Sequence, residues 1–207
     1  MTAEVRFDAA TIAETVARLG ANIERDHPDG VVLVGVLKGA LLFTADLARA
    51  IRAVPVEVDF MSISRFAPDS GRVRILHDVG TDIGGRDVVI VEDMVDTGLT
   101  AAYLTSQLEM RAPRTLSMCA LFDRPGRRIV PHPLRYRGLE LGDEFVLGYG
   151  LHVHDLYRNL PFVARGDRDD LLAAPDRYVR DLYPRGTEPR EAGGSVPKTT
   201  GARSEVL

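Results

Sequence analysis

Apolar residues recur along the chain with spacings that predict helices and strands in alternation. Between Ile12 and Ile23 the apolar side chains lie three or four residues apart, which predicts an amphipathic helix over residues 9–26. Turn residues follow this helix. The unbroken β-branched run at 31–36 is then typical of a strand that is covered on both faces of a sheet. The chain therefore begins with a helix that leads into a buried strand.

The same two patterns continue through most of the chain. The further elements predicted are helices at 40–51 and 101–111, and strands at 54–63, 73–76, 87–91, 116–122 and 145–147. Strands that alternate with helices usually pair in parallel through right-handed crossovers. The pattern thus predicts an α/β domain around a parallel core sheet.

Two stretches break the pattern. Residues 66–72 carry proline, aspartate, serine and glycine, which predicts a mobile loop. From Pro184 onward almost no large apolar residue occurs until the end, so this part buries too little surface to offset the entropy of ordering. We therefore expect one domain over residues 1–183 and a disordered tail over 184–207.

Composition narrows the class of protein. The net charge of −4 shows no basic excess, which argues against a nucleic-acid partner. Cys119 is the single cysteine, so no intramolecular disulfide forms, and its apolar neighbours predict a buried thiol. Neither a signal peptide nor an apolar run long enough to cross a membrane is found, and we expect a cytoplasmic protein with no membrane partner.

The most informative stretch is VVIVEDMVDTGLT at residues 88–100, in which a buried strand runs into an acidic loop and then a helix. Ligands of parallel sheets bind at the carboxyl ends of strands. Backbone N–H groups at the start of a helix bind phosphate, and Gly98 lets the phosphate approach closely. The adjacent carboxylates of Glu92 and Asp93 accept hydrogen bonds from a diol. A ribose 5-phosphate matches this arrangement, whereas an isolated acidic loop with a helix cap is the plainer alternative.

These residues resemble the phosphoribosyl pyrophosphate signature of the type I phosphoribosyltransferases, in particular the hypoxanthine-guanine branch. The resemblance extends over roughly residues 31–165 and includes VGVLKGALLF, VEVDFM, VRILHD and DEFVLGYG in the family's order. It implies a parallel core sheet flanked by helices, with a small hood that covers the base. It also implies transfer of phosphoribosyl from phosphoribosyl pyrophosphate to a purine-like base with Mg²⁺ as cofactor. We expect a homo-oligomer, either a dimer or a tetramer.

The resemblance also implies a role for individual residues. Glu92 and Asp93 match the acids that hold the ribose diol and the metal, and Asp96 matches the catalytic residue that handles the proton at N7 of the purine. The residues implied to bind phosphoribosyl pyrophosphate besides the two acids are Leu37, Lys38, Gly39, Thr97, Gly98, Leu99, Thr100 and Arg158. Residues 37–39 match the family's pyrophosphate loop, which often contains a cis peptide, and Arg158 matches an arginine near the pyrophosphate. Spacing alone would make Lys38 and Arg158 ordinary surface cations.

The base pocket is where the chain departs from the family. Phe145 resembles the aromatic residue that stacks on the purine and Val146 the residue whose backbone reads the base edge, although spacing alone favours strand core for both. Arg124 stands in place of the family's base-contacting lysine. His152 replaces an aspartate that helps to hold a second magnesium, and histidine is a poor magnesium ligand.

The predicted mobile loop also departs from the family pattern. Arg65-Phe66 replaces Ser-Tyr at the start of the loop over residues 65–76, which we expect to close over the site.

Three functions therefore remain open at this point. The chain acts on hypoxanthine or guanine, it acts on a modified purine such as a 7-deazapurine, or it is a regulator that senses phosphoribosyl pyrophosphate without catalysis.

Overall fold

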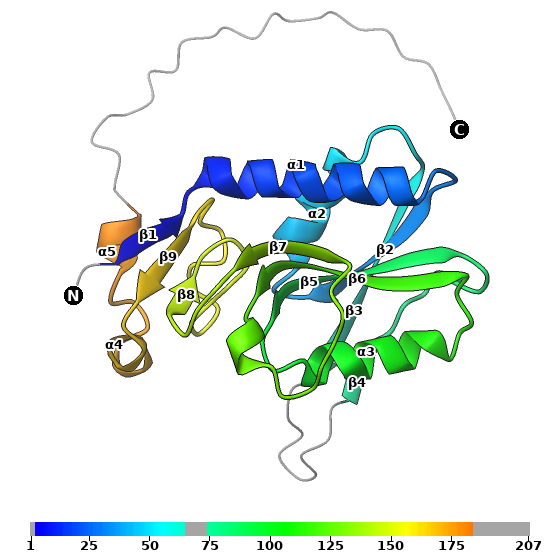
Figure 1. Cartoon of the computed structure of the whole chain (residues 1–207). Coiled ribbons are helices and arrows are strands. Elements are labelled where there is room, and N and C mark those ends of the chain that lie inside the picture. The colour runs from blue at the N-terminus through cyan, green and yellow to red at the C-terminus, as the bar shows by residue number, and fades with distance from the viewer. Residues whose placement is uncertain (1–2, 65–73, 184–207) are drawn as a thin grey trace, which may run out of the picture.

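A computed structural model describes residues 3–64 and 74–183 and shows two sheets of unequal size (Figure 1). The larger sheet has six strands in the order β4-β3-β2-β5-β6-β7. Its strands are β2 (Val31–Leu37), β3 (Val56–Ser64), β4 (Arg74–His77), β5 (Asp87–Val95), β6 (Thr115–Asp123) and β7 (Tyr136–Glu140). All neighbours pair in parallel except β3 and β4, which are antiparallel. The predicted α/β fold with a parallel core sheet is confirmed.

Helices cover both faces of this sheet. The helices α1 (Ala9–Asp26) and α2 (Leu41–Ala50) lie on one face, and α3 (Leu99–Glu109) lies on the other (Figure 1). The residues of β2 alternate between the two resulting cores. Leu33 packs with α1 and α2, whereas Val32 and Val34 pack with α3. This alternation explains why β2 is apolar at nearly every position.

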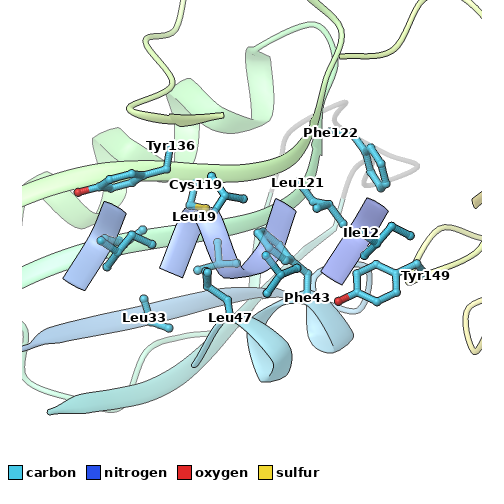
Figure 2. Packing of buried hydrophobic residues seen from close by; sticks show 14 of the residues in the cluster. Ile12, Leu19, Leu33, Phe43, Leu47, Cys119, Leu121, Phe122, Tyr136 and Tyr149 are labelled. Atoms are coloured by element: carbon cyan, nitrogen blue, oxygen red, sulfur yellow. The ribbon is translucent and has the colours of Figure 1, made fainter. Parts of the chain in front are cut away.

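The core between α1, α2 and the sheet is formed by buried apolar side chains. Ile12 and Leu19 from α1 meet Phe43 and Leu47 from α2 above Leu33 of the sheet (Figure 2). Complete burial of such a side chain stabilises the fold by about 1.5–3 kcal/mol. Asp8 caps α1 by accepting a hydrogen bond from the backbone N–H of Thr11 at 2.8 Å. Leu19 and the other apolar residues at helical spacing thus form the predicted buried face.

A second sheet is built from both ends of the chain. It has three antiparallel strands in the order β1-β9-β8, namely β1 (Glu4–Phe7), β8 (Phe145–Leu147) and β9 (Val163–Gly166). The short helices α4 (Arg168–Ala173) and α5 (Val179–Leu182) lie beside it (Figure 1). A separate apolar cluster around Tyr157 and Tyr178 stabilises this unit. The strand at 145–147 was predicted correctly, but β1, β7, β9 and both helices were missed.

Several boundaries differ from the predictions. The strand predicted at 87–91 continues to Val95, so Glu92 and Asp93 lie within β5 and not in a loop after it. Pairing with β6 causes this extension, because Glu92 lies opposite Ala120 in the parallel ladder. The helix α3 begins two residues before its predicted start. The loop at 66–72, the pair Arg65-Phe66 and the tail at 184–207 lie outside the described residues.

Candidate active site

The strand order places the site where the chain changes direction along the sheet. From β2 the chain adds β3 and β4 on one side and then returns to add β5, β6 and β7 on the other. A crevice forms at the carboxyl ends of the two strands that flank such a switch, here β2 and β5. The residues that follow these two strands include Lys38 and Asp96. The predicted pyrophosphate loop and acidic segment are therefore neighbours in space.

The end of β5 carries the two adjacent carboxylates. Glu92 and Asp93 are 6% and 8% exposed, which is rare for acidic side chains unless polar groups surround them. A Cβ atom added to Gly39 would lie 1.8 Å from Oδ2 of Asp93, so the loop after β2 packs directly on this carboxylate. The peptide bond between Leu37 and Lys38 is cis, as the resemblance implied.

The turn between β5 and α3 is shaped for an anion. Gly98 precedes α3 with a φ of +83°, and a Cβ there would lie 2.2 Å from the carbonyl oxygen of Val130. Only glycine fits this position without strain. The carbonyl of Thr97 accepts hydrogen bonds from the N–H groups of Ile129 and Val130, at 2.9 and 3.0 Å. These contacts hold the N–H groups of Leu99 and Thr100 at the start of an eleven-residue helix, where an anion is stabilised.

Asp96 lies between the two acids and this turn. Its backbone carbonyl accepts a hydrogen bond from Nη1 of Arg128 at 2.8 Å, which anchors the segment. Its Oδ1 atom is buried and lies 3.3 Å from Nε of Arg127, but it makes no hydrogen bond within the described residues. The carboxylate is thus held in place with one oxygen available to a ligand. The sequence predictions did not include Arg127 and Arg128.

A pocket of about 230 Å³ opens beside Asp96. It is lined by Asp93, Met94, Asp96, Arg124, Phe145, Val146, Leu151 and His152. Arg124 is 6% exposed, and one of its Nη2 hydrogens is donated to the carbonyl oxygen of Glu144. Burial lowers the pKa of Arg124, and the negative charge of Asp96 opposes this effect. All three residues predicted to contact the base therefore surround one pocket together with the predicted catalytic acid.

Arg158 reaches the site from the far end of the chain. Its Nη1 donates to the carbonyl oxygen of Gly150 at 2.6 Å. Gly150 itself packs on the loop after β2, because a Cβ there would lie 2.1 Å from the carbonyl oxygen of Gly39. Arg158 and Lys38 both form ion pairs with Asp155. The structure thus joins the two predicted pyrophosphate cations through an acid that the sequence analysis did not consider.

Comparison with known proteins agrees with this arrangement. The family profile of the phosphoribosyl transferase domain matches residues 7–154. A hypoxanthine phosphoribosyltransferase of Salmonella typhimurium is 41% identical over 170 residues, covering 79% of this chain and 95% of that protein. A hypoxanthine-guanine phosphoribosyltransferase of Mycobacterium bovis is 40% identical over 173 residues, covering 79% of this chain and 85% of the relative.

A solved structure agrees as well. The hypoxanthine-guanine phosphoribosyltransferase of Bacillus anthracis superposes with a TM-score of 0.77 at 37% identity, covering 81% of this chain and all of that one. The fold and site define a phosphoribosyltransferase, and the chain belongs to the phosphoribosyl transferase family. Within this family it is a purine phosphoribosyltransferase. The family resemblance stated from the sequence is therefore confirmed, and the reading as a non-catalytic regulator is not supported.

None of the helices in the described part of the chain is long and apolar enough to cross a membrane.

Proposed function

We propose that the chain transfers the 5-phosphoribosyl group from phosphoribosyl pyrophosphate to a 6-oxopurine base, hypoxanthine or guanine. The products are the nucleoside 5′-monophosphate and pyrophosphate. The observation that carries this proposal is the pocket in which Arg124 and Asp96 lie beside Phe145 and Val146. The names of the relatives, which are hypoxanthine and hypoxanthine-guanine phosphoribosyltransferases, support the same base class. We also propose that the enzyme is a homo-oligomer, a dimer or a tetramer.

The chain's own residues divide the work between phosphate, ribose and base. The N–H groups at Leu99 and Thr100 bind the 5-phosphate, with the hydroxyls of Thr97 and Thr100 as further donors. Glu92 and Asp93 accept hydrogen bonds from the ribose hydroxyls. A ring nitrogen of the base forms the new bond to C1′ while the bond to pyrophosphate breaks and its electron pair leaves with the pyrophosphate. Asp96 accepts the proton that leaves N7 of the purine as this bond forms.

The residues present fit a magnesium ion. Carboxylate oxygens are its preferred protein ligands, and it is commonly held by one or two carboxylates together with substrate phosphates. The buried carboxylates of Glu92 and Asp93 form such a pair. When bound, Mg²⁺ would offset the negative charge that develops on the departing pyrophosphate.

Arg124 favours a base with an oxygen at position 6. Its buried Nε has no hydrogen-bond acceptor among the residues that the structure describes. A buried donor without a partner costs about 1–3 kcal/mol, and an oxygen of the ligand would remove this cost. The amino group of adenine would instead place a donor against a cation. Sites of this kind discriminate by about 10⁴-fold or more.

A modified purine is the second candidate. Arg124 and His152 both line the pocket, and both replace residues that the resemblance to the family implies. A larger or differently substituted ring would be compatible with this change. However, a 7-deazapurine lacks the N7 atom with which Asp96 would interact. The retained Asp96 therefore favours an unmodified purine.

A competition assay tests the base. Adenine, guanine, hypoxanthine and 7-deazaguanine are supplied at equal concentration with phosphoribosyl pyrophosphate and Mg²⁺, and the products are resolved by mass. We expect 6-oxopurine nucleotides. Arg124→Ala should lose most of the activity, whereas Arg124→Lys should retain part of it, because lysine still donates to the same oxygen. Preferred use of adenine by the parent enzyme would contradict the role given to Arg124.

A further inference from the structure

Asp155 is an acidic residue among the cations of the site. Its carboxylate accepts hydrogen bonds from Arg158, with Nη2 at 2.9 Å and Nε at 3.2 Å from Oδ1. The other carboxylate oxygen, Oδ2, lies 3.5 Å from Nζ of Lys38. The hydrogen bond from Arg158, followed by the charge of Lys38, holds the pKa of Asp155 below its ordinary value. One carboxylate is therefore shared by two cations that come from separate parts of the chain.

The backbone holds this carboxylate at the pyrophosphate loop. The N–H of Asp155 donates to Nδ1 of His152 at 3.0 Å, and Asp155 has a left-handed φ of 63°. Arg158 is fixed by its hydrogen bond to Gly150, which packs on Gly39. These contacts tie Asp155 to the segment that follows β2. The backbone of Asp155 is thus held beside the segment that follows β2, whereas its side chain and that of Lys38 are 61% and 70% exposed.

The following step rests on the proposed function, in which Lys38 and Arg158 bind pyrophosphate. We infer that Asp155 is an internal anion that occupies the pyrophosphate subsite and lowers the affinity for ligands that carry a pyrophosphate group. The planar fork of an arginine binds a carboxylate and a phosphate in the same two-point geometry. Pyrophosphate must therefore displace Asp155 from Arg158 and Lys38 before it binds. The free energy of the lost ion pairs is subtracted from the binding free energy.

A metal site at Asp155 fits the same contacts less well. A carboxylate between two cations is a poor place for a third, because the like charges repel one another. His152 adds no metal ligand, because its Nδ1 accepts a hydrogen bond and the neutral ring then carries its proton on Nε2. Neither nitrogen offers a lone pair to a metal in this arrangement. The described ranges contain no group of three or more side chains suited to hold a metal.

An internal anion would act selectively on the ligands of one reaction. Phosphoribosyl pyrophosphate and free pyrophosphate both need the cations that Asp155 holds. The product nucleoside 5′-monophosphate carries only the 5-phosphate, which binds at the start of α3, so it leaves Asp155 in place. Asp155 would also return to Arg158 and Lys38 when pyrophosphate departs. The residue therefore tunes affinity for the donor substrate and for one product, but not for the other product.

The test compares three ligands in the full-length protein by calorimetry with Mg²⁺ present. The ligands are pyrophosphate, phosphoribosyl pyrophosphate and inosine 5′-monophosphate. Asp155→Asn removes the negative charge and keeps the size of the side chain. Asparagine also tolerates a left-handed backbone. Exposed ion pairs are worth little individually, so we expect the two pyrophosphate ligands to bind between about twofold and thirtyfold more tightly. The affinity for the monophosphate should stay unchanged.

Two further variants control the result. Asp155→Gly also tolerates the left-handed backbone and cannot accept a hydrogen bond from Arg158, so it should show the same selective gain. Glu14→Gln removes one negative charge from the exposed side of α1 and should leave all three affinities unchanged.

The possible outcomes are distinct. Unchanged pyrophosphate affinity in both Asp155 variants would overturn the inference, and so would weaker affinity, which would point to a ligand for the metal. An equal gain for the monophosphate would also overturn it, because the effect would then be one of overall charge. Failure of the parent protein to bind phosphoribosyl pyrophosphate or pyrophosphate at all would instead refute the proposed function and the inference with it.

Discussion

At the scale of single residues, Asp96 combines an anchored backbone carbonyl with a carboxylate that lines the pocket. Arg128 anchors its carbonyl oxygen, while Oδ1 lies near Arg127 without a hydrogen bond among the described residues. A group that exchanges a proton with a ligand needs a fixed position and an oxygen that is not already committed. The surroundings of Asp96 meet both needs. Its carboxylate therefore has a role that can be separated from binding.

Asp96→Asn tests this separation. The amide keeps the shape and the backbone contact with Arg128, so we expect an unchanged dissociation constant for phosphoribosyl pyrophosphate. Turnover should fall by about 10²–10⁴-fold, the usual loss when an acid–base group is removed. Steady-state kinetics and calorimetry on the same preparation measure the two quantities. Asp169→Asn, a change at an exposed acid in α4, should retain full turnover. A rate within about twofold of the parent would show that Asp96 has no such role.

At the scale of elements, the amino ends of three strands are joined by a buried polar network opposite the active site. Asp87 at the start of β5 accepts hydrogen bonds from Nε and Nη2 of Arg114, at 2.9 and 2.7 Å, and from Oγ1 of Thr115 at 2.8 Å. It also lies 3.2 Å from Nδ1 of His27, at the end of α1. Nε2 of His27 lies 3.1 Å from the hydroxyl of Tyr136 on β7. The network therefore fixes how the end of α1 and the starts of β5, β6 and β7 lie relative to one another.

We predict that Asp87→Asn lowers the free energy of unfolding by about 1–3 kcal/mol at neutral pH, since it leaves the buried ring of His27 and the more exposed Arg114 and Thr115 with a weaker acceptor. The hydrogen bond from Arg114 holds the pKa of Asp87 well below its usual range. A depressed folded-state pKa stabilises the fold above the unfolded pKa of about 4, and this contribution is lost as the pH falls toward the folded value. The stability difference between parent and variant should therefore shrink below about pH 4.

Urea unfolding between pH 3 and pH 8 measures this prediction. Glu57→Gln serves as the control, because Glu57 forms an ion pair with Arg86 in which both side chains are more than 40% exposed. Such pairs contribute little to stability. An unfolding free energy difference for Asp87→Asn that did not change with pH would contradict the assignment.

At the scale of the whole molecule, the small sheet is attached to the main core by its first strand. Phe7 in β1 stacks on Phe122 in β6, with ring centroids 5.9 Å apart. The strand β1 also pairs with β9, so Glu4 lies opposite Arg165 near the other end of the described chain. The two ends of the domain are thus locked together beside the pocket. Phe145 and Val146 in β8 reach the pocket because this sheet is held in place.

The composition of residues 184–207 predicts that they contribute neither to this lock nor to catalysis. A chain that ends at Tyr183 should unfold at the same temperature as the full chain and keep the same kcat and KM. Calorimetric melting and a turnover assay measure this. A second truncation before β9, ending at Pro161, should fail to fold, because it removes the partner of β1 and β8. If the chain that ends at Tyr183 melted several degrees below the full chain, the tail would have a structural role.

Features that depend on neighbouring residues could be predicted from the sequence alone. Periodicity predicted α1, α2, α3 and most strands of the main sheet, since burial of one face or both faces leaves a local pattern. The segment 88–100 holds the carboxylates of Glu92, Asp93 and Asp96 and a glycine turn in one continuous run. A site of that kind is visible without coordinates. The short strands β1 and β9 gave no such signal, and they pair with each other across most of the described chain.

Contacts between residues that are distant in the chain became visible only in the folded structure. The pairing of β5 with β6 kept Glu92 and Asp93 within a strand, against their low tendency to occur in one. Lys38 and Arg158 are separated by more than a hundred residues, yet both contact Asp155. No local sequence pattern predicts this contact, because the order of the strands and the packing of Gly150 on Gly39 produce it. Most of the residues that we propose for phosphoribosyl transfer therefore lie in one segment, whereas the contacts from which we infer control of pyrophosphate affinity arise from the fold.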